Sequence, residues 1–150
     1  MSLSADSDKL MFYCSACGAF NRVPVNKVAS SPRCGRCHAA LETTGKPVTV
    51  DDGNFSRLKD NSPVPVLLDV WAPWCGPCRL VAPVLEQIGK AHAGKMVVAK
   101  LNSDENPRIA GELQVRSIPA LFVFKGGQVV DQAVGALPRP QIEALLTKWM

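Results

Sequence analysis

The spacing of apolar residues predicts alternating strands and helices over the last two thirds of the chain. Strand-length apolar runs lie at 48–50, 66–71, 96–101, 121–124 and 129–134. Two of the intervening or following segments show helical spacing through the apolar residues Leu80, Val81, Val84, Leu85 and Ile88, and through Ile142, Leu145, Leu146 and Trp149. The predicted order is β-α-β-α-β-α-β-β-α. This order indicates an α/β fold with a central mixed sheet flanked by helices.

Polar residues and prolines mark where two further helices begin. Asp51 or Asp52 can cap a helix that runs through residues 55–58. Asn106 followed by Pro107 has the form of a cap and a first helical residue.

A polar joint containing glycine and proline, residues 43–47, separates this α/β part from the residues before it. The 150 residues suffice for one domain of about a hundred residues and a smaller one. We therefore expect a flexible N-terminus at 1–10, a small domain at 11–45 and a larger domain at 46–150.

Charge and hydropathy argue against several classes of partner. The net charge of +4 is spread without runs, so we expect no nucleic-acid partner. No apolar stretch reaches the ~18 residues of a membrane-spanning helix, and no secretory leader is recognisable, so we expect no membrane association. Six cysteines form three Cys-x-x-Cys pairs. Without a secretory signal these pairs favour a reducing compartment, the cytoplasm, and metal or redox chemistry over structural disulfides.

The pair Cys75 and Cys78 follows an apolar strand and opens a predicted helix. A Cys-x-x-Cys in that position is typical of a dithiol redox site. The positive end of the helix favours a thiolate on the first cysteine. Cys75 is therefore the expected nucleophile, more exposed than Cys78, the resolving thiol. The alternatives are a pair of metal ligands or two buried structural cysteines.

The other two pairs have the spacing of a four-cysteine zinc site. Sixteen residues separate Cys17 from Cys34 in the pattern formed by Cys14, Cys17, Cys34 and Cys37. The segment is too short to bury a core, so one structural Zn²⁺ would supply its folding energy. Four protein ligands leave no open position for catalysis. Two disulfides or further redox couples remain the alternative.

Three apolar residues of this segment, Phe12, Phe20 and Val23, would form its small hydrophobic face. His38 adjoins the last cysteine and is a substitute ligand or a surface histidine.

Asp69 lies within the apolar strand 66–71. A carboxylate in such a strand must be paired or have a raised pKa, unless it faces solvent. A buried carboxyl with a raised pKa can exchange protons near neutral pH.

The run Trp74-Cys75-Gly76-Pro77-Cys78, preceded by Val-Leu-Leu-Asp-Val-Trp-Ala-Pro, resembles the active site of thioredoxins. The resemblance extends from about Pro47 to the C-terminus and implies the thioredoxin fold. With the two zinc-type cysteine pairs ahead of it, the whole chain resembles the zinc-containing bacterial thioredoxins of the thioredoxin 2 family.

This resemblance implies a protein-disulfide reductase that acts by dithiol–disulfide exchange on disulfide-containing proteins. It implies recycling by NADPH-dependent thioredoxin reductase. No nucleotide-binding fingerprint is present in the sequence, so we expect no directly bound nucleotide. We expect a monomer that serves in electron transport and cell redox homeostasis.

The resemblance also implies roles for individual residues. Asp69 would assist deprotonation of Cys78, and Lys100 would lie beside Asp69. A cis Ile118–Pro119 bond would pack against the dithiol, although thioredoxins often carry Thr where Ala120 follows. The substrate would dock on Trp74, Gly76, Pro77, Ile118, Pro119 and Gly135.

Two other functions fit part of the sequence. An oxidase or isomerase can use the same fold, although Gly-Pro between the cysteines resembles the reductant branch. A binding module for nucleic acid or an unfolded protein is suggested by the basic residues Arg22, Lys27, Arg33 and Arg36. A further hypothesis is that oxidation of the four metal-type cysteines releases the metal and senses oxidants.

Overall fold

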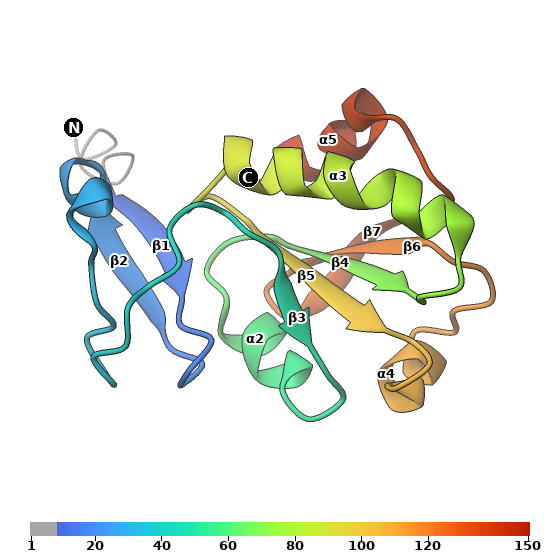
Figure 1. Cartoon of the computed structure of the whole chain (residues 1–150), viewed down its shortest axis with the longest axis horizontal. Coiled ribbons are helices and arrows are strands. Elements are labelled where there is room, and N and C mark those ends of the chain that lie inside the picture. Colours follow the sequence, from blue (N-terminus) through green and yellow to red (C-terminus); the bar gives the residue numbers. More distant parts are fainter. Residues whose placement is uncertain (1–8) are drawn as a thin grey trace.

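The computed structural model describes residues 9–150 and contains two separate sheets (Figure 1). The smaller sheet pairs β1 (Lys9–Tyr13) with β2 (Phe20–Pro24) antiparallel, and the short 3-10 helix η1 (Val25–Ser30) follows. The predicted flexible N-terminus, 1–10, lies outside the described residues except for its last two, which belong to β1. We call residues 9–45 the cysteine-rich segment and residues 46–150 the α/β segment.

The α/β segment contains the predicted order of elements. Its strands are β3 (Val48–Val50), β4 (Val66–Trp71), β5 (Val97–Asn102), β6 (Ala120–Lys125) and β7 (Gln128–Val134). Its helices are α2 (Phe55–Asn61), α3 (Gly76–Ala91), α4 (Pro107–Glu112) and α5 (Arg139–Thr147). The sheet order is β3-β5-β4-β6-β7. The strands β3, β5 and β4 run parallel to one another. The strand β6 pairs antiparallel with β4, and β7 pairs antiparallel with β6. The mixed sheet is confirmed.

Alternate residues of each strand serve opposite faces of this sheet. On β4, Leu68 and Val70 belong to the core that contains Phe55 of α2 and Ile109 of α4. Leu67, which points to the opposite face, belongs to the core formed with α3 and α5. Figure 1 shows α3 and α5 together on one side of the sheet and α2 and α4 on the other. Helices on both faces therefore bury every residue of β4 except the last, Trp71, which is half-buried.

The start of α2 differs from the prediction. The residue before the helix is Asn54, and it makes no side-chain cap. Asp51 instead accepts the N–H groups of Gly53 and Asn54, at 2.8 Å each, within the preceding turn. The prediction that Asp51 or Asp52 caps α2 was wrong because the chain needs an additional turn before the helix.

Asp52 caps α4, which lies far away in sequence. Its carboxylate accepts the N–H groups of Arg108 at 3.0 Å and Ile109 at 2.9 Å. Asn106, the predicted cap of α4, makes no capping bond to the helix. Its Oδ1 accepts the N–H of Asp52 at 2.9 Å. Asp52 and Asn106 thus tie the turn after β3 to the turn before α4.

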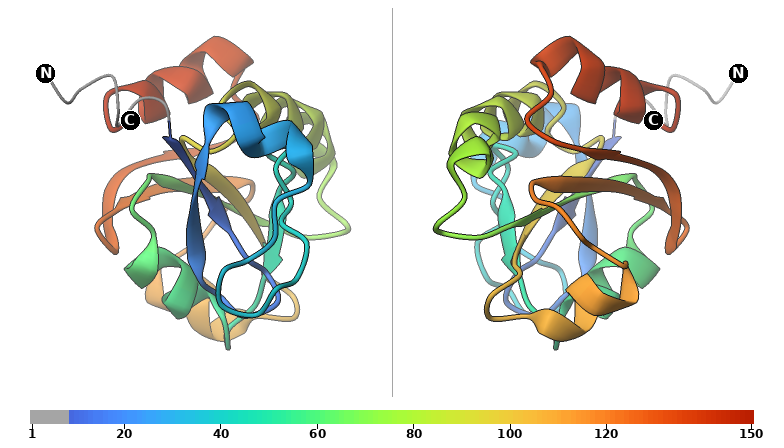
Figure 2. Two further views of the ribbon diagram at one scale, coloured as in Figure 1. Left: turned by 90° about the vertical axis from the view of Figure 1, so that its left-hand side faces the viewer. Right: turned by 90° about the vertical axis from the view of Figure 1, so that its right-hand side faces the viewer.

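The cysteine-rich segment packs on the α/β segment beside β3 and the end of α3 (Figures 1 and 2). The N–H of Met11 donates to the carbonyl of Gly94 over 2.9 Å. Tyr13 is only 8% exposed and belongs to the core under α2 and α4. The two segments therefore share one of the hydrophobic cores.

Phe20 was expected on the apolar face of the cysteine-rich segment, and that prediction was wrong. Phe12 and Val23 do pack there. Phe20 packs instead against the core of the α/β segment, with its ring 5.3 Å from that of Tyr13. Phe20 and Val23 are three residues apart on β2, so strand alternation places their side chains on opposite faces of the hairpin.

Candidate active site and metal centre

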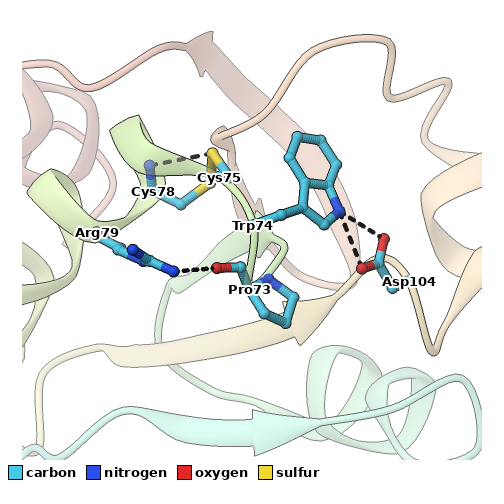
Figure 3. The surroundings of a disulfide bond; sticks show 6 residues. All are labelled: Pro73, Trp74, Cys75, Cys78, Arg79 and Asp104. Carbon is cyan, nitrogen blue, oxygen red and sulfur yellow. Dashed lines mark hydrogen bonds between the residues drawn. A yellow bond between two sulfur atoms is a disulfide. The ribbon is translucent and has the colours of Figure 1, made fainter.

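The third cysteine pair lies at the start of α3, as predicted. Cys75 directly precedes the helix with an extended backbone, φ −85° and ψ 109°, and Cys78 lies in the first turn. A disulfide joins the two residues, whose Cα atoms are 5.3 Å apart (Figure 3). The N–H of Cys78 donates to Cys75 Sγ over 3.2 Å. This N–H and the positive end of the helix favour a thiolate at Cys75 once the disulfide is reduced.

Gly76 and Pro77 occupy the first two helical positions. Proline is well suited there, because its missing N–H would have no partner within the helix. No neighbouring atom lies within 4 Å of a Cβ built on Gly76. The residues between the cysteines therefore start the helix and leave the surface above it open.

Both cysteines are buried in the disulfide form. Cys75 is 3% exposed and Cys78 is 4% exposed. The expectation that Cys75 is the more exposed was therefore wrong for this form. Ala72 completes a small cluster with the two cysteines, and Trp71 and Ile118 pack against it.

Asp69 is fully buried on β4, at 0% exposure. By alternation it faces the same side of the sheet as Leu67, beneath α3, and as Trp71, which packs against the cysteines. Neither carboxylate oxygen has a hydrogen-bond partner among the described residues. Burial raises the pKa of Asp69 to about 6, and the neighbouring Lys100 opposes this shift. A carboxyl with this pKa is able to bind or release a proton at a pH somewhat below neutral.

Lys100 is the register partner of Asp69 across the parallel strands β4 and β5. Its Nζ lies 4.9 Å from the centre of the Trp71 ring, within reach of a cation–π contact. Lys100 thus neighbours both the strand position of the buried carboxyl and an aromatic ring that packs against the two cysteines.

An exposed surface surrounds the disulfide. Trp74 is 69% exposed, and its Nε1 donates to both carboxylate oxygens of Asp104, at 3.2 and 3.0 Å (Figure 3). Figure 3 also shows the Arg79 guanidinium donating to the carbonyl of Pro73 over 2.8 Å. These bonds fix the Trp74 ring and the turn that carries it.

The segment before β6 completes this region. The Ile118–Pro119 bond is cis, as expected. The N–H of Gly135 donates to the carbonyl of Pro119 over 2.8 Å. Gly135 has φ 101°, a value that side chains rarely adopt. Ile118 packs against the cysteine cluster, so the predicted docking residues before β6 and after β7 adjoin those at the start of α3.

The other four cysteines come together, as the zinc pattern predicts. The Sγ atoms of Cys14 and Cys37 are 3.6 Å apart, as are those of Cys17 and Cys34. All four lie within 4.8 Å of one another. Sulfurs bound tetrahedrally to zinc at about 2.3 Å are separated by about 3.8 Å. The four thiols are therefore arranged to bind one metal ion, and none is in a disulfide.

Two similar turns, or knuckles, present these sulfurs. In each, the first cysteine accepts a backbone N–H through its carbonyl, from Gly18 at 2.7 Å and from His38 at 2.9 Å. Gly18 and His38 occupy equivalent left-handed positions, with φ 82° and 67°. His38 thus has a conformational role in the second knuckle, and it is not part of the four-residue cluster found among residues 9–150.

Two residues near this centre were not predicted from the sequence. Tyr13 directly precedes Cys14 and joins the two segments through its packing. Asn21 lies on β2, and its Oδ1 accepts the N–H of Gly35 over 2.9 Å. A polar residue in a short strand between two metal knuckles is the only signal that would have indicated Asn21.

In the part of the chain from 9 to 150, no helix combines the length and the apolar character needed to cross a membrane.

Comparisons with known proteins agree with both sites. The thioredoxin family model matches residues 46–148. The model described as "Thioredoxin 2, N-terminal", a zinc ribbon, matches residues 13–39. Thioredoxin 1 of Nostoc sp. is 52% identical over 99 residues, which cover 66% of this chain and 92% of that protein.

One relative is similar over nearly the whole chain. Thioredoxin C-3 of Corynebacterium nephridii is 40% identical over 137 residues, 91% of this chain and 93% of its own length. The redox disulfide at a helix start, the four-thiol cluster and these similarities lead to one conclusion. The chain belongs to the thioredoxin family of protein-disulfide reductases and carries the N-terminal zinc-ribbon domain of thioredoxin 2.

Proposed function

We propose that Cys75 is the nucleophile and Cys78 the resolving thiol when the chain reduces protein disulfides. The observation that carries this assignment is the N–H of Cys78, which points at Cys75 Sγ from 3.2 Å. This donor and the helix end stabilise negative charge on Cys75, and Cys78 lies inside the first turn. The attacking group is the thiolate, so the sulfur that is better stabilised as an anion attacks first.

The reaction has two exchange steps. Cys75 thiolate attacks one sulfur of the target disulfide, which forms a mixed disulfide and releases the other target sulfur as a thiolate that takes a proton. Cys78 then loses its proton and attacks Cys75 Sγ, which releases the second target sulfur as a thiol. Two electrons pass to the target, and Cys75–Cys78 is left as the disulfide.

Asp69 is proposed as the group that takes the proton from Cys78. It is buried on the sheet face beneath α3, and burial raises its pKa to about 6. Only the carboxylate can accept a proton, so the resolving step should slow as the pH falls through about 6. Lys100 favours the carboxylate form and would tune this pKa.

The substrate is proposed to dock on the surface that surrounds the disulfide. Trp74 is exposed and held by Asp104, and Ile118 packs against the cysteines. The proposed docking residues are Trp74, Gly76, Pro77, Ile118, Pro119 and Gly135.

A trapping experiment tests the assignment of the two cysteines. With Cys78→Ser, a target disulfide should be captured as a stable mixed disulfide on Cys75, detected as a covalent adduct by mass spectrometry. The matched variant Cys75→Ser should capture much less. Equal capture by the two variants, or preferential capture on Cys78, would refute the assignment.

The direction of electron flow is proposed to be reductive, with thioredoxin reductase restoring the dithiol. A reduction potential of Cys75–Cys78 near about −270 mV supports this, and a value near about −120 mV would mean that the chain donates disulfides. We propose a cytoplasmic location, because four clustered free thiols need a reducing compartment to stay available for a metal. We also propose a monomer.

The metal is proposed to be zinc, held by Cys14, Cys17, Cys34 and Cys37 in a structural site. Zinc commonly occupies tetrahedral four-thiolate sites, although iron can as well. Metal analysis of the protein purified under reducing conditions should give one zinc per chain. We propose the boundary between the two domains at residues 45 and 46.

Sensing of oxidants is a second proposed role for the metal centre, favoured by the exposure of one ligand. Cys37 is exposed, whereas Cys14 and Cys34 are buried. Peroxide would therefore reach Cys37 first and release the metal. Full oxidation of Cys75–Cys78 by peroxide without any loss of zinc would exclude this role.

A further inference from the structure

Asn21 connects the strand that leaves the first knuckle to the second knuckle. Its Oδ1 accepts the N–H of Gly35 over 2.9 Å, and Gly35 directly follows Cys34. Within residues 9–150, no side chain accepts a hydrogen bond from a backbone N–H of the first knuckle. Among the described residues, a hydrogen bond from its backbone to a side-chain amide therefore stabilises the second knuckle, and the first knuckle has no equivalent bond.

The other half of the Asn21 amide is without a partner. Nδ2 is buried and makes no hydrogen bond within the part of the chain that the structure describes. A buried N–H donor without a partner costs about 1–3 kcal/mol, and native proteins keep few of them. We therefore expect an acceptor that becomes available in another state of the protein, in which the four cysteines are no longer free thiols.

The sulfur of Cys34 is the candidate acceptor, because Asn21 holds the N–H of Gly35, the residue that directly follows Cys34. The N–H of Arg36 already donates to this sulfur over 3.4 Å. A neutral thiol is a weak acceptor, whereas a metal-bound thiolate is an anion and accepts much more strongly.

We propose that Asn21 is a positioning residue of the metal centre, which holds Gly35 through Oδ1 and donates from Nδ2 to the Cys34 thiolate when the metal is bound. The inference rests on the proposed four-thiolate zinc site. Side chains that orient metal ligands in this way typically contribute 10- to 100-fold to metal affinity. Asn21 should therefore slow the loss of zinc from the cluster.

Zinc release to a chromogenic chelator tests the two halves of the amide separately. Asn21→Ala removes both hydrogen bonds. Asn21→Asp keeps an oxygen for Gly35 but replaces the donor with a second anion beside the thiolate. Asn26→Asp, at an exposed position of η1, controls for the change in charge within the same segment.

If Nδ2 donates to Cys34, both Asn21 variants should release zinc at least about 10-fold faster than the natural chain, with Asn21→Asp the faster. Asn26→Asp should release zinc at the natural rate. If Asn21 only fastened the backbone, Asn21→Asp would behave like the natural chain and Asn21→Ala alone would be fast. That second pattern would overturn the proposal.

Cobalt substitution gives a readout that does not depend on release. Loss of a hydrogen bond to the thiolate raises the energy of its electrons, so the sulfur-to-cobalt charge-transfer band should move to lower energy in both Asn21 variants. An unmoved band would overturn the donor role. A natural chain that binds no zinc at all would instead refute the metal site on which the proposal rests.

Discussion

The cysteine-rich segment and the α/β segment use the same Cys-x-x-Cys spacing for different chemistry. After Cys17 and Cys37 the backbone enters the left-handed region, at φ 82° and 67°, and each knuckle turns back on itself. After Cys78 the chain continues as α3. The knuckles direct four sulfurs at one point, whereas the helix sets one sulfur against its N-terminal N–H groups. The residues that follow the second cysteine therefore decide between metal binding and redox exchange.

The two segments also differ in the cores that hold them. The core of the cysteine-rich segment consists of Phe12, Val23 and Leu41, with two of the metal-type cysteines. The α/β segment buries a separate core on each face of its sheet. A core of five residues that includes two ligands is small, so we expect the fold of the segment to depend on the metal. We expect the α/β segment, with its two larger cores, to fold without one.

Removal of the metal should produce the largest difference in stability between the two segments. Cys34→Ser should abolish zinc binding and unfold the cysteine-rich segment, because structural zinc contributes about 10–16 kcal/mol of apparent binding energy in small zinc domains. The α/β segment should remain folded and keep its exchange chemistry. Amide hydrogen exchange, resolved along the chain, should show loss of protection in β1 and β2 only.

Cys78→Ser is the matched control, since it should leave zinc content and the protection of β1 and β2 unchanged. Equal loss of protection in β4 and β5 of Cys34→Ser would show that the larger core also depends on the metal.

Tyr13 tests how strongly the segments depend on each other. Tyr13→Ala should lower the free energy of unfolding of the zinc-loaded chain by about 3–4 kcal/mol, because it empties a buried site between the two segments. Tyr13→Phe keeps the ring and should cost far less. Denaturant titration measures both, and the same small loss for the two variants would mean that the shared core adds little.

Asp69 gives the α/β segment a pH dependence of its own, which does not involve the metal. Its pKa of about 6 in the folded protein exceeds the value of about 3.9 in an unfolded chain, so the folded state binds the proton more tightly. Stability contributed by this proton is full below about pH 4 and is lost as the pH rises through about 6. The loss amounts to about 3 kcal/mol.

Asp69→Asn does not titrate and should therefore gain about 3 kcal/mol on the natural chain between pH 4 and pH 7. Unfolding free energies of both proteins at several pH values measure this difference. A difference that stayed constant with pH would show that Asp69 titrates normally. Asp69→Asn should also slow the resolution of a mixed disulfide at pH 7.

Local patterns in the sequence predicted most of the fold and both cysteine sites. Asp69 was recognisable because a carboxylate within an apolar strand is unusual. The four-cysteine cluster was recognisable because two Cys-x-x-Cys pairs sixteen residues apart are typical of a metal site. The misses were contacts between distant segments. Asp52 caps a helix more than fifty residues away, and Phe20 faces the neighbouring segment. The capping contact leaves no mark on the local pattern, so only the packed structure reveals it. Alternation along β2 places Phe20 and Val23 on opposite faces, but it does not show which residues Phe20 contacts.

Substitution of His38 should have the smallest effect on stability, and it tests whether the two knuckles are equivalent. It occupies the left-handed position that Gly18 fills in the first knuckle, and a side chain there costs about 1 kcal/mol. Its only hydrogen bonds in the described chain are made through its backbone, including that from Arg33 to its carbonyl over 3.2 Å. His38→Gly preserves these bonds and should raise the stability of the zinc-loaded segment by about 1 kcal/mol.

Zinc stoichiometry should stay at one per chain in His38→Gly, because the four thiols complete the site. The reverse change, Gly18→Ala, should destabilise the segment, since an added Cβ meets strain at φ 82° and the side chain of Arg57. Thermal unfolding with metal analysis of both variants separates conformation from ligation. Loss of zinc from His38→Gly, with Gly18→Ala fully loaded, would mean that the histidine binds the metal and that the two knuckles are not equivalent.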